Sequence, residues 1–426
     1  MPTASSRWSA SRQALAGLAL CAAAGVQAQN PVPVIREIEF RGNEVTRPAT
    51  MLREMTLQVG DPADPREVER SRQGVQDLGL FRSVDAELEP VEGGARLVIT
   101  VKEKYYILPL PRGDISSDGG YGWGAQLRWN NVWGLNHTFN PLFERRQPSE
   151  GDADPEKRGL QTRFQFRYHA PFVFDSEYSL GFGGIYLDTP YLEPIRYDVT
   201  QTVYSADVSR KLTGGHGSQG WTAFSGLTWN EEVNTGPGAP PELGHALSAS
   251  IGAFYRDLHF NVYSDEGTTY SFFVQSASED ISSDYNFTNW GVTYARYLNV
   301  GRAAHQNLNL LFEGRWRHDN DLDDFYAVGG NQSLRGFEPE TEKGDAYYRV
   351  SVEYLRPVIR RSIRALFVVD AARAFAGPED IDFDRINVGA GIGVRVRIQA
   401  FVAFDLELGI AWPLNGGSPR WFASKV

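Results

Sequence analysis

Hydrophobic and polar residues alternate one by one along most of the chain beyond residue 107. In the segment 308–317, leucines and aromatic residues fall on one face of an extended chain, whereas Glu313 and Arg315 fall on the other. Three more segments repeat this pattern: 163–168, 388–397 and 404–412. Strands of about ten residues with one apolar and one polar face are typical of a β-barrel whose outer wall lies in a membrane. A soluble sandwich is disfavoured, because so many long alternating strands would not be expected in it.

The alternation predicts sixteen antiparallel strands within 107–426, a region long enough to give each strand a connection of its own. The expected strands are 107–113, 120–131, 136–146, 160–170, 176–187, 199–212, 220–230, 246–257, 268–278, 289–298, 306–317, 344–356, 363–373, 388–398, 400–412 and 420–426. The long polar connections all follow odd-numbered strands: 147–159, 231–245 and 318–343. This parity is typical of an outer-membrane barrel with short periplasmic turns and long extracellular loops.

Residues 33–104 have a mixed pattern, which predicts a small domain of the order strand, helix, helix, strand and strand. Asp64 is placed to cap a helix, with Pro65 in its first turn and Glu67 as the acid of a capping box. Alternating residues on both sides of a Gly-Gly pair at 93–94 predict a hairpin. The expected fold class is therefore mainly β: one small β-α-α-β-β domain followed by a sixteen-stranded transmembrane antiparallel β-barrel.

The segment 1–28 is typical of a secretory signal peptide. Arg7 and Arg12 supply a positive start, and an Ala-rich apolar stretch follows at 14–26. A short membrane anchor is the alternative, but the apolar stretch is too short for it. Cleavage after Ala28 would also remove the single cysteine, Cys21, and would leave a mature chain that has neither a disulfide nor a cysteine metal site.

Charge and histidine spacing narrow the classes of function. The 426 residues carry 42 Lys and Arg against 53 Asp and Glu, and this net charge of −11 argues against a nucleic-acid-binding protein. The seven histidines are scattered without the spacing of metal ligands, and no glycine-rich segment precedes a helix as phosphate binding would require. We therefore expect no metal, no cofactor and no enzymatic activity. An outer-membrane lipase or protease is an alternative without a motif in its favour.

The small domain at residues 33–104 resembles a polypeptide-transport-associated (POTRA) domain. The resemblance lies in IREIEFRGN at its start, in DLGLFRSV at 77–84 and in LVITVKEK at its end. It implies a periplasmic domain that handles unfolded polypeptides, through strand addition along an exposed sheet edge. The alternative is a spacer that holds other parts of the protein below the membrane.

The connection after the eleventh expected strand carries the most specific motif in the chain. It contains Gly329, Gly330, Leu334, Arg335, Gly336 and Phe337, in the run GGNQSLRGF. With this motif, the chain resembles the bacterial surface antigen family of outer-membrane assembly and translocation barrels, a BamA/TamA-like superfamily, here with a single POTRA domain. The resemblance implies that the loop folds back into the barrel lumen.

The resemblance also implies acidic partners for Arg335 on neighbouring strands. Glu353 lies on the charged face of its strand, and Asp370 matches the acid of the family's Phe-x-Asp-x-Gly strand. Val368 and Ala372 replace the Phe and Gly of that pattern, so we expect different packing around the loop tip. A buried arginine needs such partners, because removal of one member of a buried ion pair costs about 3–5 kcal/mol. The alternative is an ordinary surface loop with Arg335 in water.

The resemblance implies a cofactor-free function in outer-membrane protein insertion, in assembly, or in polypeptide translocation, with the lumen loop as a key element. The implied partners are unfolded outer-membrane or exported polypeptides, outer-membrane lipid and accessory periplasmic proteins. A two-partner secretion transporter is an alternative within the family, disfavoured because such proteins resemble a plug helix followed by two POTRA domains. A passive outer-membrane pore or structural barrel is the alternative from another class. The sequence names no client.

Two prolines mark the first expected strand of the barrel. Pro109 and Pro111 lie two positions apart, so their missing N–H donors would face the same neighbouring strand. Together with the short last strand, 420–426, they predict a weakly bonded junction between the first and last strands. The alternative is that residues 107–113 form a linker.

Overall fold

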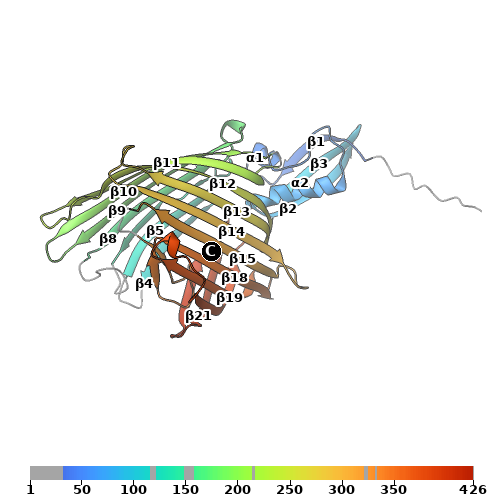
Figure 1. Cartoon of the computed structure of the whole chain (residues 1–426). Coiled ribbons are helices and arrows are strands. Elements are labelled where there is room, and N and C mark those ends of the chain that lie inside the picture. Colours follow the sequence, from blue (N-terminus) through green and yellow to red (C-terminus); the bar gives the residue numbers. More distant parts are fainter. Residues whose placement is uncertain are drawn as a thin grey trace, which may run out of the picture.

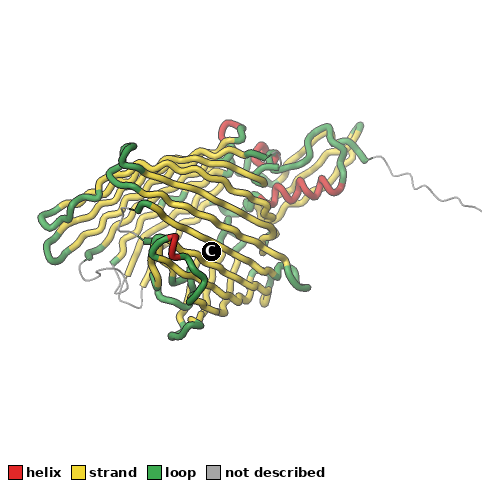
Figure 2. The backbone as a smooth tube through the Cα atoms, viewed as in Figure 1, coloured by secondary structure: helices red, strands yellow, loops and turns green. Residues whose placement is uncertain are grey.

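The computed structural model describes residues 32–115, 121–147, 158–213, 216–320, 325–331 and 333–425. Within them, a small domain projects from one end of a large β-barrel (Figure 1). Strands make up most of both parts (Figure 2). The expected signal peptide, residues 1–28, lies outside the described residues, as does most of the acidic loop 147–159. No helix in the described part of the chain is long and apolar enough to cross a membrane.

The small domain, called the module below, consists of β1 (Ile35–Arg41), α1 (Pro48–Leu52), α2 (Pro65–Asp77), β2 (Phe81–Val91) and β3 (Gly94–Glu103). β3 is central, because it pairs parallel with β1 and antiparallel with β2. The expected order of elements is confirmed. Asp64 caps α2 by accepting the N–H of Arg66 at 2.7 Å. The expected capping box is wrong, because the Glu67 carboxylate pairs with Arg70 and the Asp64 N–H donates to a preceding carbonyl.

The two helices of the module pack against one face of its three-stranded sheet. Six hydrophobic residues of the strands and helices are fully buried there: Ile35, Met51, Val75, Phe81, Leu97 and Ile99. Full burial of one such side chain contributes about 1.5–3 kcal/mol, so this core dominates the stability of a domain of this size. The opposite face of the sheet carries exposed charges, with Arg41 bonded to Glu39 and Glu89.

Seventeen strand segments of the described residues close into the barrel. They are β4 (Ile107–Ile115), β5 (Tyr121–Val132), β6 (His137–Phe139), β7 (Leu142–Arg146), β8 (Gln161–Ala170), β9 (Tyr178–Tyr191), β10 (Tyr197–Lys211), β11 (Gly220–Thr235), β12 (Gly244–Asn261), β13 (Ser264–Ala277), β14 (Phe287–Asn299), β15 (Asn307–His318), β18 (Ala346–Ile359), β19 (Ile363–Phe375), β20 (Asn387–Arg397), β21 (Asp405–Pro413) and β22 (Arg420–Lys425).

These segments fill sixteen positions, because β6 and β7 share one position between β5 and β8. The expected single strand 136–146 is therefore corrected: it is interrupted at Asn140 and Pro141, where proline has no N–H to donate to a ladder. The other expected strands are confirmed, with ends that differ by a few residues. Residues 400–404 of the expected strand 400–412 are the exception: they lie in the turn before β21, where Ala403 has a φ angle of +42° that a strand does not adopt. Residues 107–113 belong to β4, which pairs with β5, and are no linker.

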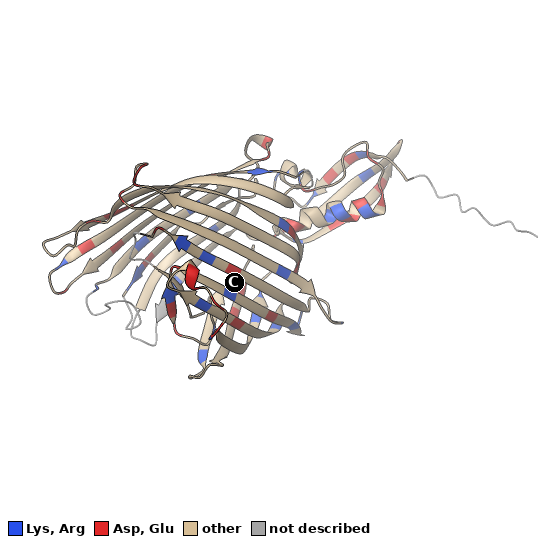
Figure 3. Ribbon diagram, in the orientation of Figure 1, with Lys and Arg blue, Asp and Glu red and all other residues tan. Residues whose placement is uncertain are grey.

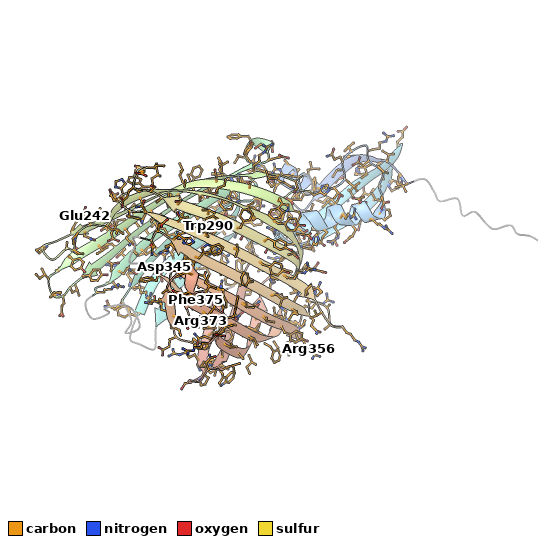
Figure 4. The ribbon with its side chains drawn as sticks, viewed as in Figure 1. Glu242, Trp290, Asp345, Arg356, Arg373 and Phe375 are labelled. Carbon is orange, nitrogen blue, oxygen red and sulfur yellow. The ribbon has the colours of Figure 1, made fainter. Side chains whose placement is uncertain are left out.

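Aromatic side chains follow the outer wall from strand to strand. Four rings stand at directly paired positions on β11–β14: Trp221, Tyr255, Tyr270 and Tyr294. Their successive centroids lie 5.3, 5.8 and 5.2 Å apart. Trp290, which is labelled on β14 in Figure 4, stacks on Trp316 at 6.2 Å. Half-exposed aromatic rings of this kind are typical of the wall of a membrane barrel.

Glycines on several barrel strands make room for aromatic rings on the neighbouring strand. Three such pairs stand directly opposite each other: Phe224 with Gly252, Phe273 with Gly291, and Phe422 with Gly409. A Cβ at these glycines would lie 2.6, 2.3 and 2.3 Å from the ring. Charged positions are sparse on β11–β13 and denser around β18–β21 (Figure 3). The functional motif lies against that charged part of the wall.

Candidate functional site

The motif lies in the connection between β15 and β18, whose base is a short hairpin of β16 (Tyr326–Val328) and β17 (Glu342–Gly344). Gly329 and Gly330 have φ angles of +139° and +75°, which favour glycine. The Ser333 Oγ donates to the Gly329 carbonyl at 2.7 Å and accepts the Gly329 N–H at 2.8 Å. The motif therefore forms a tight loop that folds back from the hairpin. We call residues 329–337 the lumen loop.

Apolar packing anchors the tip of the lumen loop. Leu334 is fully buried against Val328 and Ala372, and Phe337 packs against the same cluster. Ala372 itself has no exposed surface, so its methyl group is enclosed by this cluster. Val368, the other departure from the family pattern, is buried in a separate cluster on the wall of the barrel. The loop tip is thus held by a small apolar patch as well as by charges.

The backbone of the lumen loop lies directly against β20 and β21. A Cβ on Gly389 of β20 would lie 2.1 Å from the carbonyl oxygen of Arg335, so only glycine permits this approach. Gly336, with a φ of +95°, lies against the backbone of Ala411 on β21. The alternation of the sequence places Gly389 on the inner face of its strand, but no signal in the sequence identifies this contact.

Arg335 points into a group of acidic side chains on three strands. Its Nε and Nη2 donate to the two carboxylate oxygens of Asp370 at 2.7 and 2.9 Å, a bidentate pair. Its Nη1 donates to Glu353 and to Glu407, both at 2.9 Å. Its Nη2 also donates to the Ser351 Oγ at 3.0 Å. All five guanidinium donors are therefore used, and both partners expected from the sequence lie at hydrogen-bond distance.

A second arginine completes this group of charges. Arg395 on β20 donates from Nη2 to Glu353 and from Nε to Glu407, both at 2.8 Å. Each of these two glutamates therefore bridges two arginines. Sequence reasoning missed Arg395, Glu407 and Ser351 as members of the site. Alternation alone places Arg395 and Glu407 on the charged face of their strands, but it does not say which charges meet across strands.

The five charged residues are called the arginine cluster below: Arg335, Glu353, Asp370, Arg395 and Glu407. Four of them are buried, and the side chain of Glu353 is 16% exposed. With three carboxylates and two guanidinium groups, the cluster carries a net charge of −1. Loss of Arg335 would leave three largely desolvated carboxylates with one cation, at a cost of about 3–5 kcal/mol by the measure of other buried pairs.

The arginine cluster forms part of the wall of a cavity of about 460 Å³ in the barrel lumen. On the module side of the cavity, Arg397 of β20 pairs with Asp405 at 2.9 Å and with Asp265 of β13 at 3.1 Å. The cavity is therefore lined by paired charges. Among the residues that the structure describes, no group of three or more His, Cys, Asp or Glu is arranged to hold a metal ion.

Comparison with protein families gives two matches, one for each part of the molecule. Residues 33–104 match the POTRA family, described as a surface antigen variable number repeat. Residues 131–418 match the Omp85 superfamily domain, and this match covers more than half of the chain.

Two curated relatives are both outer membrane protein assembly factors, named BamA. The protein from Nitratidesulfovibrio vulgaris is 36% identical over 70 residues, which are 16% of this chain and 9% of the relative. The protein from Neorickettsia risticii is 35% identical over 148 residues, which are 34% of this chain and 18% of the relative. The chain thus matches less than a fifth of the length of either relative.

Solved structures share the fold over most of the chain. BamA from Haemophilus ducreyi, crystallised without its POTRA domains 1–3, aligns with a TM-score of 0.53 at 16% identity, covering 92% of this chain and 85% of that one. CdiB from Escherichia coli aligns with a TM-score of 0.63 at 15% identity, covering 92% and 77%. At these identities the similarity concerns the fold alone.

Proposed function

The chain belongs to the Omp85 superfamily, and from this premise we propose that it inserts or translocates other polypeptides at the bacterial outer membrane. The barrel spans the membrane, and the module stands in the periplasm. The curated relatives are assembly factors of the outer membrane, which favours insertion of barrel proteins as the activity. The clients are unfolded outer-membrane or exported polypeptides, which meet the module first and the membrane lipid next.

One observation carries the proposal. A loop from the end of the barrel opposite the module is fixed inside the lumen by a buried arginine, and all the hydrogen-bond donors of its guanidinium group are used. An ordinary surface loop would leave Arg335 in water, whereas here the arginine is buried among carboxylates of the barrel wall. We assign to the lumen loop the role of holding the wall formed by β18–β21 in one arrangement during client handling.

The module supports the same function through its position at one mouth of the barrel. Asp77 at the end of α2 accepts the main-chain N–H of Phe260 at 2.8 Å and contacts the His259 Nδ1 at 2.8 Å, both near the end of β12. Glu54, which follows α1, accepts the N–H of Ser218 in the turn before β11 at 3.0 Å. A client bound on the module would therefore lie next to the barrel, and accessory periplasmic proteins would meet the module's exposed face.

The experiment that tests the proposal replaces the chromosomal gene with variants and compares the outer-membrane proteome with that of the parent. Deletion is expected to deplete a set of outer-membrane or surface proteins, and the parental gene restores them. Arg335→Ala is expected to fail in this rescue while its own barrel reaches the membrane. Arg196→Ala, which removes an exposed arginine in the turn between β9 and β10, is the matched control and is expected to rescue fully.

Two outcomes would overturn the proposal. If deletion leaves the proteome unchanged but alters the uptake of small solutes, the passive pore is the better description. If Arg335→Ala assembles normally and rescues every depleted protein, the lumen loop has no part in the activity.

An assay with the purified protein in lipid vesicles distinguishes insertion from translocation. An inserted client resists extraction by carbonate, whereas a translocated client is recovered inside the vesicle.

A further inference from the structure

The turn 398–404 between β20 and β21 reaches beneath the junction of the first and last barrel strands. In the order of the barrel, β22 and β4 lie between β21 and β5. The turn nevertheless contacts Tyr105, which precedes β4, and Arg128 on β5. It therefore passes the ends of two strands and joins both sides of the junction at the module end of the barrel.

Hydrogen bonds and a ring contact hold this turn to the side of the junction formed by β4 and β5. The Tyr105 N–H donates to the Ala400 carbonyl at 2.8 Å, and Tyr105 and Phe401 are partners in an isolated parallel bridge. The rings of Tyr105 and Phe401 lie 5.8 Å apart. The Arg128 Nη1 donates to the Ala403 carbonyl at 2.9 Å. Two main-chain carbonyls of the turn are thus bonded to groups beyond the junction.

The same turn is fixed to the module and to the barrel wall. Val402 packs against the hydrophobic core of the module. At the base of the turn, Arg397 donates to Asp405 at 2.9 Å and to Asp265 of β13 at 3.1 Å. Since β14, β15, β18 and β19 all lie between β13 and β20, this second pair crosses part of the lumen. The turn cannot move without disturbing the module or these ion pairs.

The junction above the turn has fewer means of holding its strands together. β4 contains Pro109 and Pro111, which have no N–H to donate to a ladder. β22 has six residues, whereas its other neighbour, β21, has nine. The ladder of the junction is therefore short and built on a strand with two missing donors, whereas the turn adds hydrogen bonds across it.

We propose that the turn 398–404 is a clasp that keeps the module end of the junction between β4 and β22 closed. The proposal rests on the proposed function and adds to it that the junction, where β4 has two prolines and β22 is short, is the part of the wall that separates for a client. With the clasp closed, separation begins at the opposite end of the strands, and the clasp acts as the fixed hinge. Tyr105, Arg128 and Val402 are its positioning residues.

The first test measures the junction without any client. Spin labels at Leu110→Cys and Ala423→Cys, in a Cys21→Ala background, report the distance between β4 and β22 in the purified protein in lipid nanodiscs. The clasp-breaking pair Val402→Asp with Arg128→Ala is expected to shift the distribution to longer and broader distances. An unchanged distribution in a folded variant would overturn the proposal. If the pair does not fold, Arg128→Ala alone removes one hydrogen bond of the clasp and is expected to give a smaller shift in the same direction.

The second test locks the clasp. Tyr105→Cys with Phe401→Cys places two cysteines at bridge partners, and a disulfide between them is expected to leave client insertion unchanged, because the hinge stays closed throughout. Loss of insertion on oxidation, restored by a reductant, would overturn the proposal. The control pair, Asn261→Cys with Ser264→Cys, stands at partnered positions of the β12–β13 turn away from the junction. If the parent and all variants fail to insert a client, the proposed function is wrong. The spin-label distances between β4 and β22 still show whether the turn keeps the junction closed.

Discussion

The module and the barrel each contain a network of arginines and carboxylates with nearly the same distances. On the outer face of the module, Arg41 lies 2.7 Å from Glu39 and 2.9 Å from Glu89. In the lumen, Arg335 lies 2.7 Å from Asp370 and 2.9 Å from Glu353. The side chain of Arg41 is 44% exposed, whereas that of Arg335 is 9% exposed.

The contrast teaches that distance does not measure the importance of an ion pair. Water screens and replaces the contacts of the exposed network, so its loss changes little. In the lumen the charges have already lost most of their water, so each depends on the others. The exposed pairs keep the module's outer face soluble and polar, while the buried ones determine the position of a loop.

The largest expected effect comes from removal of the central cation. Arg335→Ala should lower the free energy of unfolding of the barrel by about 3–5 kcal/mol, because the three carboxylates of the cluster would remain with one arginine. Urea titration of the purified protein in lipid vesicles measures this loss. The faster migration of the folded barrel in an SDS gel run without heating is a second measure, because it disappears when the barrel unfolds. A loss as small as that of Arg41→Ala would mean that water reaches the cluster and that the contrast does not hold.

Smaller and unequal losses of stability are expected from substitution of two other members of the arginine cluster, Glu407 and Arg395. Glu407→Gln makes the arginine cluster neutral and keeps the side-chain shape, so we expect a loss of about 1–2 kcal/mol. Arg395→Met makes the net charge more negative and should cost more than Glu407→Gln. The comparison of the two variants in the same titration tests whether charge balance, and not shape, governs the cluster. Equal losses would favour shape.

Lys104 provides an intermediate case outside the barrel strands, because it is buried but has no carboxylate at salt-bridge distance in the described residues. Its Nζ donates to the Gly79 carbonyl at 2.7 Å and lies 4.5 Å from the ring centre of Phe260. Burial lowers the pKa of Lys104 to about 8. Between that value and the ordinary pKa of about 10.4, the unfolded chain holds a proton that the folded chain has lost, so stability rises with pH.

This predicts a pH-dependent difference between the parent and Lys104→Met. The parent should gain stability relative to the variant as the pH is raised from 8 to 10, since the variant has no group to titrate at this position. Thermal unfolding at both pH values, followed by near-ultraviolet circular dichroism, measures the difference. A difference that stays constant across this range would show that Lys104 keeps an ordinary pKa.

The smallest expected effect is that of the exposed network. Arg41→Ala should leave the melting temperature of the module unchanged, and the addition of salt should not alter this result, because water already screens its pairs with Glu39 and Glu89. The same melting curves measure it. A clear loss of stability would mean that the exposed network acts as a unit and would weaken the distinction between the two regions.

Most of the fold could be predicted from the sequence, because a strand in a membrane barrel must alternate along its whole length. The one interrupted strand, at Asn140 and Pro141, escaped because the apolar pattern continues across the break. In the module, the hairpin and the cap of α2 depend on local residues such as Asp64, which a sequence displays directly. The pairing of Glu67 with Arg70 is a choice between two local partners, and spacing alone does not decide it.

The site was only partly predictable. Arg335, Glu353 and Asp370 were identified through the resemblance to a family, and alternation agrees that both acids face inward. Glu407 and Arg395 carry the same signal of an inward charge, but the contacts they make depend on barrel closure and on the path of a loop. Gly389 could not be recognised at all, because its role is set by the position of the Arg335 carbonyl, which lies far from it in the sequence.

The close approach of Gly389 to the lumen loop makes the seat of Arg335 depend on the absence of one side chain. The space between the Arg335 carbonyl and β20 does not admit even a methyl group. A methyl group at position 389 would therefore push the loop away from β20 and draw the Arg335 guanidinium away from its carboxylates. A single position without a side chain thus sets how deeply the loop can sit in the lumen.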